Sequence, residues 1–148
     1  MQISSRFTVA LHLFACMDVF GADHKITSDF LAGSIGTNPV IVRKIMVQLQ
    51  DAGLIRIARG TGGITAEKPY EQTTFYDVYK AVEAVQDDTL FRFHDKPNPQ
   101  CPVGRNIHTL LDAKLTDIQN AMEEEMRRHT LSELREGMRD ILQSEVSG

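Results

Sequence analysis

The segment from Thr27 to Thr65 constrains the fold more than any other part of the chain. Asn38 followed by Pro39 predicts a helix start, because asparagine caps a first turn and proline suits the first helical position. Gly36 precedes that start, where glycine permits a sharp reversal between two helices. The sequence therefore predicts two helices joined by a tight turn. The buried stripe of the second helix, over residues 39–52, is Val42, Ile45, Met46 and Leu49.

A glycine-tipped hairpin is predicted directly after these two helices. Gly53 can end the second helix, residues 54–58 form a β-branched run, and residues 64–66 supply a return strand. The tip between the strands reads Arg59-Gly60-Thr61-Gly62-Gly63. A helix-turn-helix followed by a cationic hairpin is more typical of DNA-reading proteins than of other classes, with one element for the major groove and one for the backbone or minor groove.

Further helices are predicted on both sides of this segment. Ser4 or Ser5 can cap a first helix, and Thr74 opens a capping box before another. A long helix is expected over residues 102–128, followed by a last amphipathic helix after Thr130. The predicted fold class is mainly α with a small β-hairpin.

The long helix carries a narrow apolar stripe, with steps of three or four residues between apolar positions. Such a stripe suits pairing with another long helix. The chain is therefore divided into residues 1–86 for the helix-turn-helix and hairpin, residues 87–101 for a loop, and residues 102–148 for the C-terminal helices.

Composition limits the classes of function that remain. The net charge is −4, but residues 1–70 carry seven Lys/Arg against five Asp/Glu, a net of +2, and the remainder carries nine against fifteen, a net of −6. Phosphate affinity depends on local cations such as Arg43, Lys44, Arg56 and Arg59 rather than on the total. No run of 18 apolar residues and no signal peptide are present, so a cytoplasmic protein without a membrane span is expected.

Four segments stand in a characteristic order and spacing: residues 47–56, the tip at residues 59–63, residues 76–83, and Cys101-Pro-Val-Gly104. In this arrangement the chain resembles the Rrf-two family of bacterial winged-helix regulators, and the last segment looks closest to its cluster-free YwnA-type branch. The resemblance implies a transcriptional regulator, usually a repressor, that binds a partly palindromic operator as a homodimer. The long helices of that dimer would cross along the stripe, at Ile107, Leu111, Leu115, Ile118 and Met122.

The candidate DNA contacts lie in the helix-turn-helix and at the hairpin tip. The first residues of the second helix in such a motif reach base edges, where Arg43 can bond a guanine and Val40 can touch a thymine methyl. The alternative is a solvated helix face beside an ordinary turn. Ile64 and Thr65 stand where many family members carry a glycine and an aromatic residue. The candidate set is Thr27, Ser28, Asn38, Val40, Arg43, Lys44, Arg59, Gly60, Thr61, Gly62 and Gly63.

Cys101 is the single cysteine between residues 87 and 105. Iron–sulfur members of the family hold their cluster with three closely spaced cysteines in this region, and one thiolate is too few. No cluster, other cofactor or metal is therefore expected. The start of a helix favours the thiolate form of a cysteine, which makes Cys101 a candidate redox sensor. The alternative is that Cys101 only caps the helix and has no redox role. Cys16 is expected in the core, and a Cys16–Cys101 bridge remains open.

Two other classes of function compete with a DNA-binding repressor. One is a winged-helix module that binds protein without specific DNA binding, and the other is a thiol redox protein. The cations at Arg43, Lys44 and Arg59 argue against the first, and the lack of a Cys-x-x-Cys motif argues against the second. The sequence also shows no nucleophile motif, phosphate loop or paired catalytic carboxylates, so an enzyme is not expected. The expected partners are double-stranded operator DNA, a second copy, and an unidentified small-molecule or oxidant effector.

Overall fold

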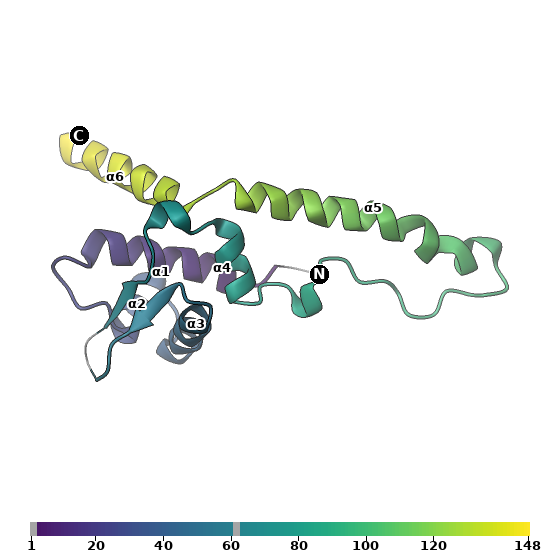
Figure 1. Cartoon of the computed structure of the whole chain (residues 1–148), viewed down its shortest axis with the longest axis horizontal. Coiled ribbons are helices and arrows are strands. Elements are labelled where there is room, and N and C mark those ends of the chain that lie inside the picture. Colours follow the sequence, from purple (N-terminus) through teal and green to yellow (C-terminus); the bar gives the residue numbers. More distant parts are fainter. Residues whose placement is uncertain (1–2, 61–62) are drawn as a thin grey trace.

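The computed structural model describes residues 3–60 and 63–148 (Figure 1). Within these residues the chain forms six α-helices and one antiparallel hairpin, which confirms the predicted fold class. The helices are α1 (Arg6–Phe20), α2 (Ser28–Ile35), α3 (Pro39–Asp51), α4 (Phe75–Ala81), α5 (Pro102–Arg127) and α6 (Leu131–Ser147). The strands are β1 (Ile55–Ile57) and β2 (Ile64–Ala66), and 3-10 turns occupy Tyr70–Gln72 and Gln86–Asp88.

The turn between α2 and α3 forms as predicted. Gly36 has φ +78°, and its N–H donates to the carbonyl of Ala32, which closes α2. Oδ1 of Asn38 accepts a hydrogen bond of 2.8 Å from the N–H of Val40, and Pro39 occupies the first position of α3. These local interactions fix where each helix starts and ends.

One apolar core lies beneath α1, α2, α3, α4 and the hairpin. The predicted α3 stripe of Val42, Ile45, Met46 and Leu49 is buried in it. Tyr70 enters the same core, where its hydroxyl donates a 2.7 Å hydrogen bond to the carbonyl of Phe14. Burial, reinforced by the nearby Asp18 carboxylate, raises the pKa of Tyr70, so its hydroxyl remains a donor at neutral pH.

Helix α5 leaves this core and extends away from it (Figure 1). None of its described residues is buried, and only its C-terminal part, through Met122 and Met126, packs against the core. No helix in the described ranges is long and apolar enough to cross a membrane.

A backbone junction fixes the corner between α5 and α6. The N–H of Phe75 donates to the carbonyl of His129 at 2.8 Å, and the N–H of Leu131 donates to the carbonyl of Thr73 at 2.9 Å. Between them, Thr74 and Thr130 form an isolated antiparallel bridge. The corner is therefore held to the segment before α4 on both sides of Thr130.

Helix α6 then packs back onto the core rather than continuing beside α5. Leu131 is 1% exposed, and Arg135 lies over the ring of Tyr70, 4.6 Å from its centroid. The same guanidinium pairs with Asp18 at 3.2 Å and with Glu71 at 2.9 Å. The sequence-based division groups α6 with the long helix, yet α6 contacts the body that contains α1.

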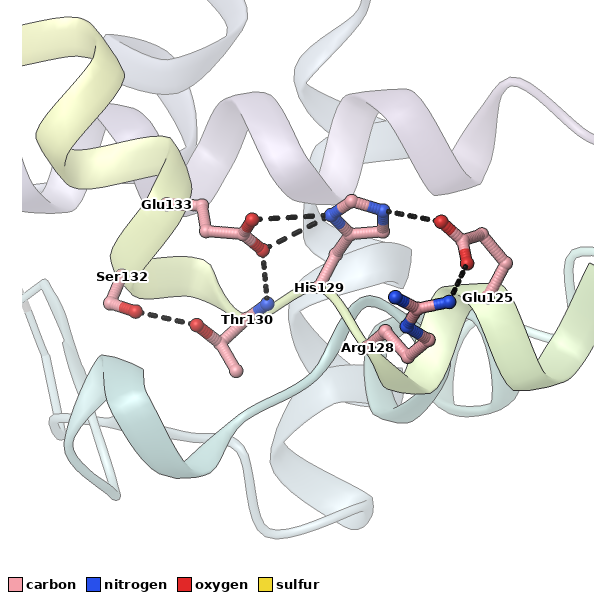
Figure 2. A network of polar contacts seen from close by, with 6 residues as sticks. All are labelled: Glu125, Arg128, His129, Thr130, Ser132 and Glu133. Atoms are coloured by element: carbon pink, nitrogen blue, oxygen red, sulfur yellow. Dashed lines mark hydrogen bonds and ion pairs between the residues drawn. The ribbon is translucent and has the colours of Figure 1, made fainter.

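Figure 2 shows a polar network at the α5–α6 corner. Nδ1 of His129 lies 3.2 Å from a carboxylate oxygen of Glu133, and Nε2 lies 3.3 Å from one of Glu125. Glu133 also accepts from the N–H of Thr130 and completes a capping box at the start of α6. The hydrogen bonds to Glu133 and then Glu125 raise the pKa of His129 above its ordinary value of 6.5.

We expect the corner to make the stability of the protein depend on pH. Because the pKa of His129 is raised in the folded state, protonated His129 stabilises the fold fully below pH 6.5, and this contribution is lost as pH rises through the raised pKa. The excess unfolding free energy of the wild type over His129→Gln should therefore shrink as pH rises from about 6.5 through the raised pKa of His129. Urea titrations across that range measure it, and a constant difference would refute the expectation.

Candidate DNA-binding surface

The start of α3 presents its polar and cationic residues at the surface. Val40 is 47% exposed, and Arg43 and Lys44 are exposed one turn further on. Nη1 of Arg43 donates to Oγ of Ser28, 3.3 Å away at the start of α2. The turn therefore brings Ser28 and Arg43 together, and Arg43 can exchange this single weak bond for a base contact.

Two residues proposed as DNA contacts already serve as caps. Oγ1 of Thr27 accepts from the N–H of Phe30 at 3.2 Å, as Oδ1 of Asn38 does for Val40. Both side-chain oxygens therefore have a structural role that is independent of DNA. Any contact of Thr27 or Asn38 with DNA remains a prediction.

The structure adds Arg6, which the sequence reasoning missed as a site residue. Arg6 starts α1, and it lines an open groove of about 540 Å³ along α3, together with Val40, Arg43, Lys44, Val47 and Gln48. Gln48 also lines the groove, but its Oε1 atom is buried and lacks a hydrogen-bond partner among the described residues. The groove thus combines three cations with exposed methyl groups, which are chemical groups that contact phosphates and base edges.

The hairpin pairs Ile55 with Ala66 and Ile57 with Ile64. Its stem is attached to α3, since Oε1 of Gln50 accepts from the N–H of Ile57 at 2.8 Å. Ile64 is 4% exposed, so its side chain faces the core. Arg59 and Gly60 are exposed at the tip, while the proposed contacts at Thr61 and Gly62 lie outside the described residues.

Arg56 is engaged within the hairpin stem. Its guanidinium binds the carboxylate of Glu67 through two hydrogen bonds, of 2.9 and 3.1 Å. Because Glu67 balances its charge locally, Arg56 contributes less to phosphate attraction than its place in the sequence suggests. Arg59 remains the cation of the tip.

The fold requires glycine at position 63 because the backbone of Ile26 packs closely against it. The φ of Gly63 is +79°, and a Cβ atom there would lie 3.0 Å from the backbone N and O of Ile26. The next residue uses this close approach, since the N–H of Ile64 donates to the carbonyl of Ile26 at 3.0 Å. The hairpin is thereby held against the segment that precedes α2.

We expect Gly63→Ala to destabilise the protein by about 1–3 kcal/mol, because it combines backbone strain with a clash. Gly60→Ala is the matched control. Gly60 also has positive φ, at +71°, but a Cβ atom there meets nothing within 4 Å. Urea unfolding measures both variants, and equal losses would contradict the packing role of Gly63.

The predicted stripe of α5 runs along its outer part. Ile107, Leu111 and Leu115 are half-buried and Ile118 is 53% exposed, whereas Met122 packs on the core of its own chain.

The loop before α5 lies beside the same helix. Phe93 stacks on His108 with ring centroids 4.3 Å apart, and His94 meets the edge of that ring.

Both cysteines are free thiols. Cys101 occupies the N-cap position of α5, but its side chain makes no capping hydrogen bond, and it is half-buried. Cys16 is 4% exposed within α1, as predicted for a core residue.

Comparison with known proteins agrees with this architecture. The Rrf2 family, described as iron-dependent transcriptional regulators, matches residues 3–137. This chain belongs to the Rrf2 family. As a member, it is a DNA-binding transcriptional regulator of the helix-turn-helix type, and its relatives are regulators rather than enzymes.

Three similar proteins illustrate the relationship. YwnA of Bacillus subtilis strain 168, named as an HTH-type transcriptional regulator, is 34% identical over 133 residues, which cover 90% of this chain and 96% of YwnA. A Lactobacillus plantarum protein described as a transcriptional regulator is 25% identical, with a TM-score of 0.77 and 97% of each chain covered. The oxidized form of Staphylococcus aureus CymR, at 20% identity, shares the fold, with a TM-score of 0.67 over 92% of this chain and 97% of that one.

The iron dependence in the description of the Rrf2 family does not fit the donors of this chain. Cys16 is buried in α1, whereas Cys101 precedes α5, whose first turn lies at the end remote from that body (Figure 1). Two thiolates in such different places are too few for an iron–sulfur cluster, which needs about four protein ligands. Within the described residues, no group of three His, Cys, Asp or Glu side chains could hold a metal ion.

Proposed function

We propose that this Rrf2 protein is a homodimeric repressor that reads an operator with α3 and the hairpin. The observation that carries the proposal is the groove along α3, where Arg6, Arg43 and Lys44 gather beside exposed methyl groups. Base edges are read by such bidentate and apolar contacts, and phosphates by the cations. The remaining proposed contacts are Thr27, Ser28, Asn38, Val40, Arg59, Gly60, Thr61, Gly62 and Gly63.

The dimer is proposed from the uncovered apolar stripe of α5. Ile118 is 53% exposed, and no residue of this 26-residue helix is buried. A second copy crossing along Ile107, Leu111, Leu115 and Ile118 would cover the stripe. In this proposal, residues 1–86 bind DNA, residues 87–101 form the sensing loop, and residues 102–148 dimerise, with α6 resting on the DNA-binding body.

In this proposal, the protein represses transcription by occupying promoter DNA. It acts in the cytoplasm and holds no iron–sulfur cluster.

We extend the proposal to Cys101 as a thiol through which an oxidant changes operator affinity. Its half-buried position before α5, next to the proposed dimer contacts, supports that role. Peroxide treatment of the wild type and of Cys101→Ser, followed by operator titration, tests it. Equal responses would reject it.

The decisive experiment titrates the protein against a duplex from its own upstream region and against an unrelated duplex, at about 50 and about 200 mM salt. We expect tighter binding to the upstream duplex, and affinity that falls steeply with salt. Reduced run-off transcription from that duplex would support repression. Equal, weak binding to both duplexes at both salt concentrations would reject sequence-specific reading and favour a winged-helix module that binds protein.

A further inference from the structure

A small crevice lies where α6 crosses α1 beside the end of α2. Its volume is about 150 Å³, which is enough for a molecule of the size of benzene. Most of its wall is apolar, and it opens to solvent. The lining residues are His12, Ala15, Cys16, Val19, Phe20, Ser34, Met138 and Leu142.

A nucleophile and a route for its proton share this crevice. The thiol of Cys16 donates to Oγ of Ser34 at 3.3 Å, and Oγ of Ser34 lies 3.0 Å from Nε2 of His12. Because the hydroxyl of Ser34 has one hydrogen, it donates to His12 when the ring carries its proton on Nδ1. Cys16 is 4% exposed, whereas His12 is exposed. These hydrogen bonds therefore connect the buried thiol of Cys16 with solvent.

We propose that this crevice is a binding site for small apolar α,β-unsaturated carbonyl compounds, which Cys16 captures covalently. The size and apolar walls select the ligand, and a thiolate, as a soft nucleophile, adds readily to an electron-poor alkene. Neither the DNA-binding surface nor the role proposed for Cys101 involves this crevice. The site also does not depend on the proposed repressor function, because an adduct is detected without DNA.

The reaction is balanced by the groups that line the crevice. Sγ of Cys16 forms a C–S bond to the β-carbon, and the alkene becomes an enolate. The thiol proton passes through Oγ of Ser34 to Nε2 of His12, which releases it to solvent, and a proton from solvent completes the α-carbon. Nothing leaves and no oxidant is consumed.

The first test uses 2-cyclohexen-1-one, with saturated cyclohexanone as the unreactive analogue. Peptide mapping should locate an adduct on Cys16 of the folded full-length protein, apart from any adduct on Cys101. Cys16 should react at least as fast in the folded protein as in the urea-unfolded chain, where both cysteines are equally accessible. An ordinary core thiol would instead be protected by folding, and slower reaction of Cys16 in the folded protein would overturn the proposal.

Two variants separate the crevice from general thiol reactivity. Leu142→Trp fills the crevice from a position that is 36% exposed, and it should abolish the Cys16 adduct while Cys101 reacts as before. Ser34→Ala interrupts the proton route and should slow the reaction by about 10²-fold. Cys101→Ser should keep the adduct. Undiminished labelling of Cys16 in Leu142→Trp would overturn the site, provided that thermal unfolding shows the variant to be folded.

Discussion

Replacing Leu115 and Ile118 together by glutamate is expected to leave the protein monomeric and to weaken its binding to a two-half-site operator by about 10²–10⁴-fold. The proposed dimer buries both side chains in an apolar seam, where two added carboxylates from each copy would lose hydration and repel one another. Within one chain, α5 has no buried residue, so the double variant should keep its own fold.

The matched control places the same two charges on the opposite face of α5. Thr116 and Asn120 are exposed, and at 100° per residue they lie away from the stripe. Thr116→Glu with Asn120→Glu should therefore stay dimeric and retain operator affinity. Analytical ultracentrifugation followed by DNA titration measures both variants. A dimeric stripe variant, or a monomeric control, would reject α5 as the interface.

Arg43→Ala is expected to cost about 1–3 kcal/mol of operator discrimination, a loss of roughly 5- to 150-fold in the preference over unrelated DNA. In the free protein, Arg43 makes one 3.3 Å bond to Ser28, so little folding energy is lost with it. Arg43→Lys keeps the charge but loses the planar fork. It should therefore retain most of the non-specific affinity while the preference falls.

Two other cations serve as controls for this experiment. Lys44→Ala should weaken binding to both duplexes alike and reduce the salt slope by about one. Arg56→Ala should have a smaller effect, because Glu67 already balances that guanidinium. Titrations of the four variants against both duplexes at several salt concentrations give these quantities. If Arg43→Ala weakened both duplexes equally, Arg43 would be a phosphate contact and not a base contact.

Local signals explain how much of the fold could be predicted. Asn38 with Pro39, Thr74 with Asp77, and the glycine at position 36 act within one or two turns of chain, so their structural effects follow from neighbouring residues. The strands at residues 55–57 and 64–66 were likewise placed from β-branched runs and a glycine-rich tip. The family followed from the order and spacing of such local pieces.

The features that sequence reasoning missed depend on contacts between distant segments. Arg6 reaches the α3 groove only because α1 and α3 pack together, and no spacing in the sequence indicates this. Gly63 looks like a residue for phosphate approach, yet a Cβ atom there would meet the backbone of Ile26. Met122 continues the stripe of α5 but contacts the core of its own chain, because the corner at Thr130 returns the chain to that core.

The corner at Thr130 also bears on the geometry of the operator. Backbone hydrogen bonds on both sides of Thr130 join α5 to the DNA-binding body without a flexible linker. At 1.5 Å per residue, the 26 residues of α5 span about 39 Å, similar to the 34–36 Å between successive major-groove faces of a duplex. In the proposed dimer, the crossing point along α5 therefore sets the separation of the two reading helices. A shift of that crossing would change the preferred spacing of operator half-sites while every base-contacting residue stayed the same.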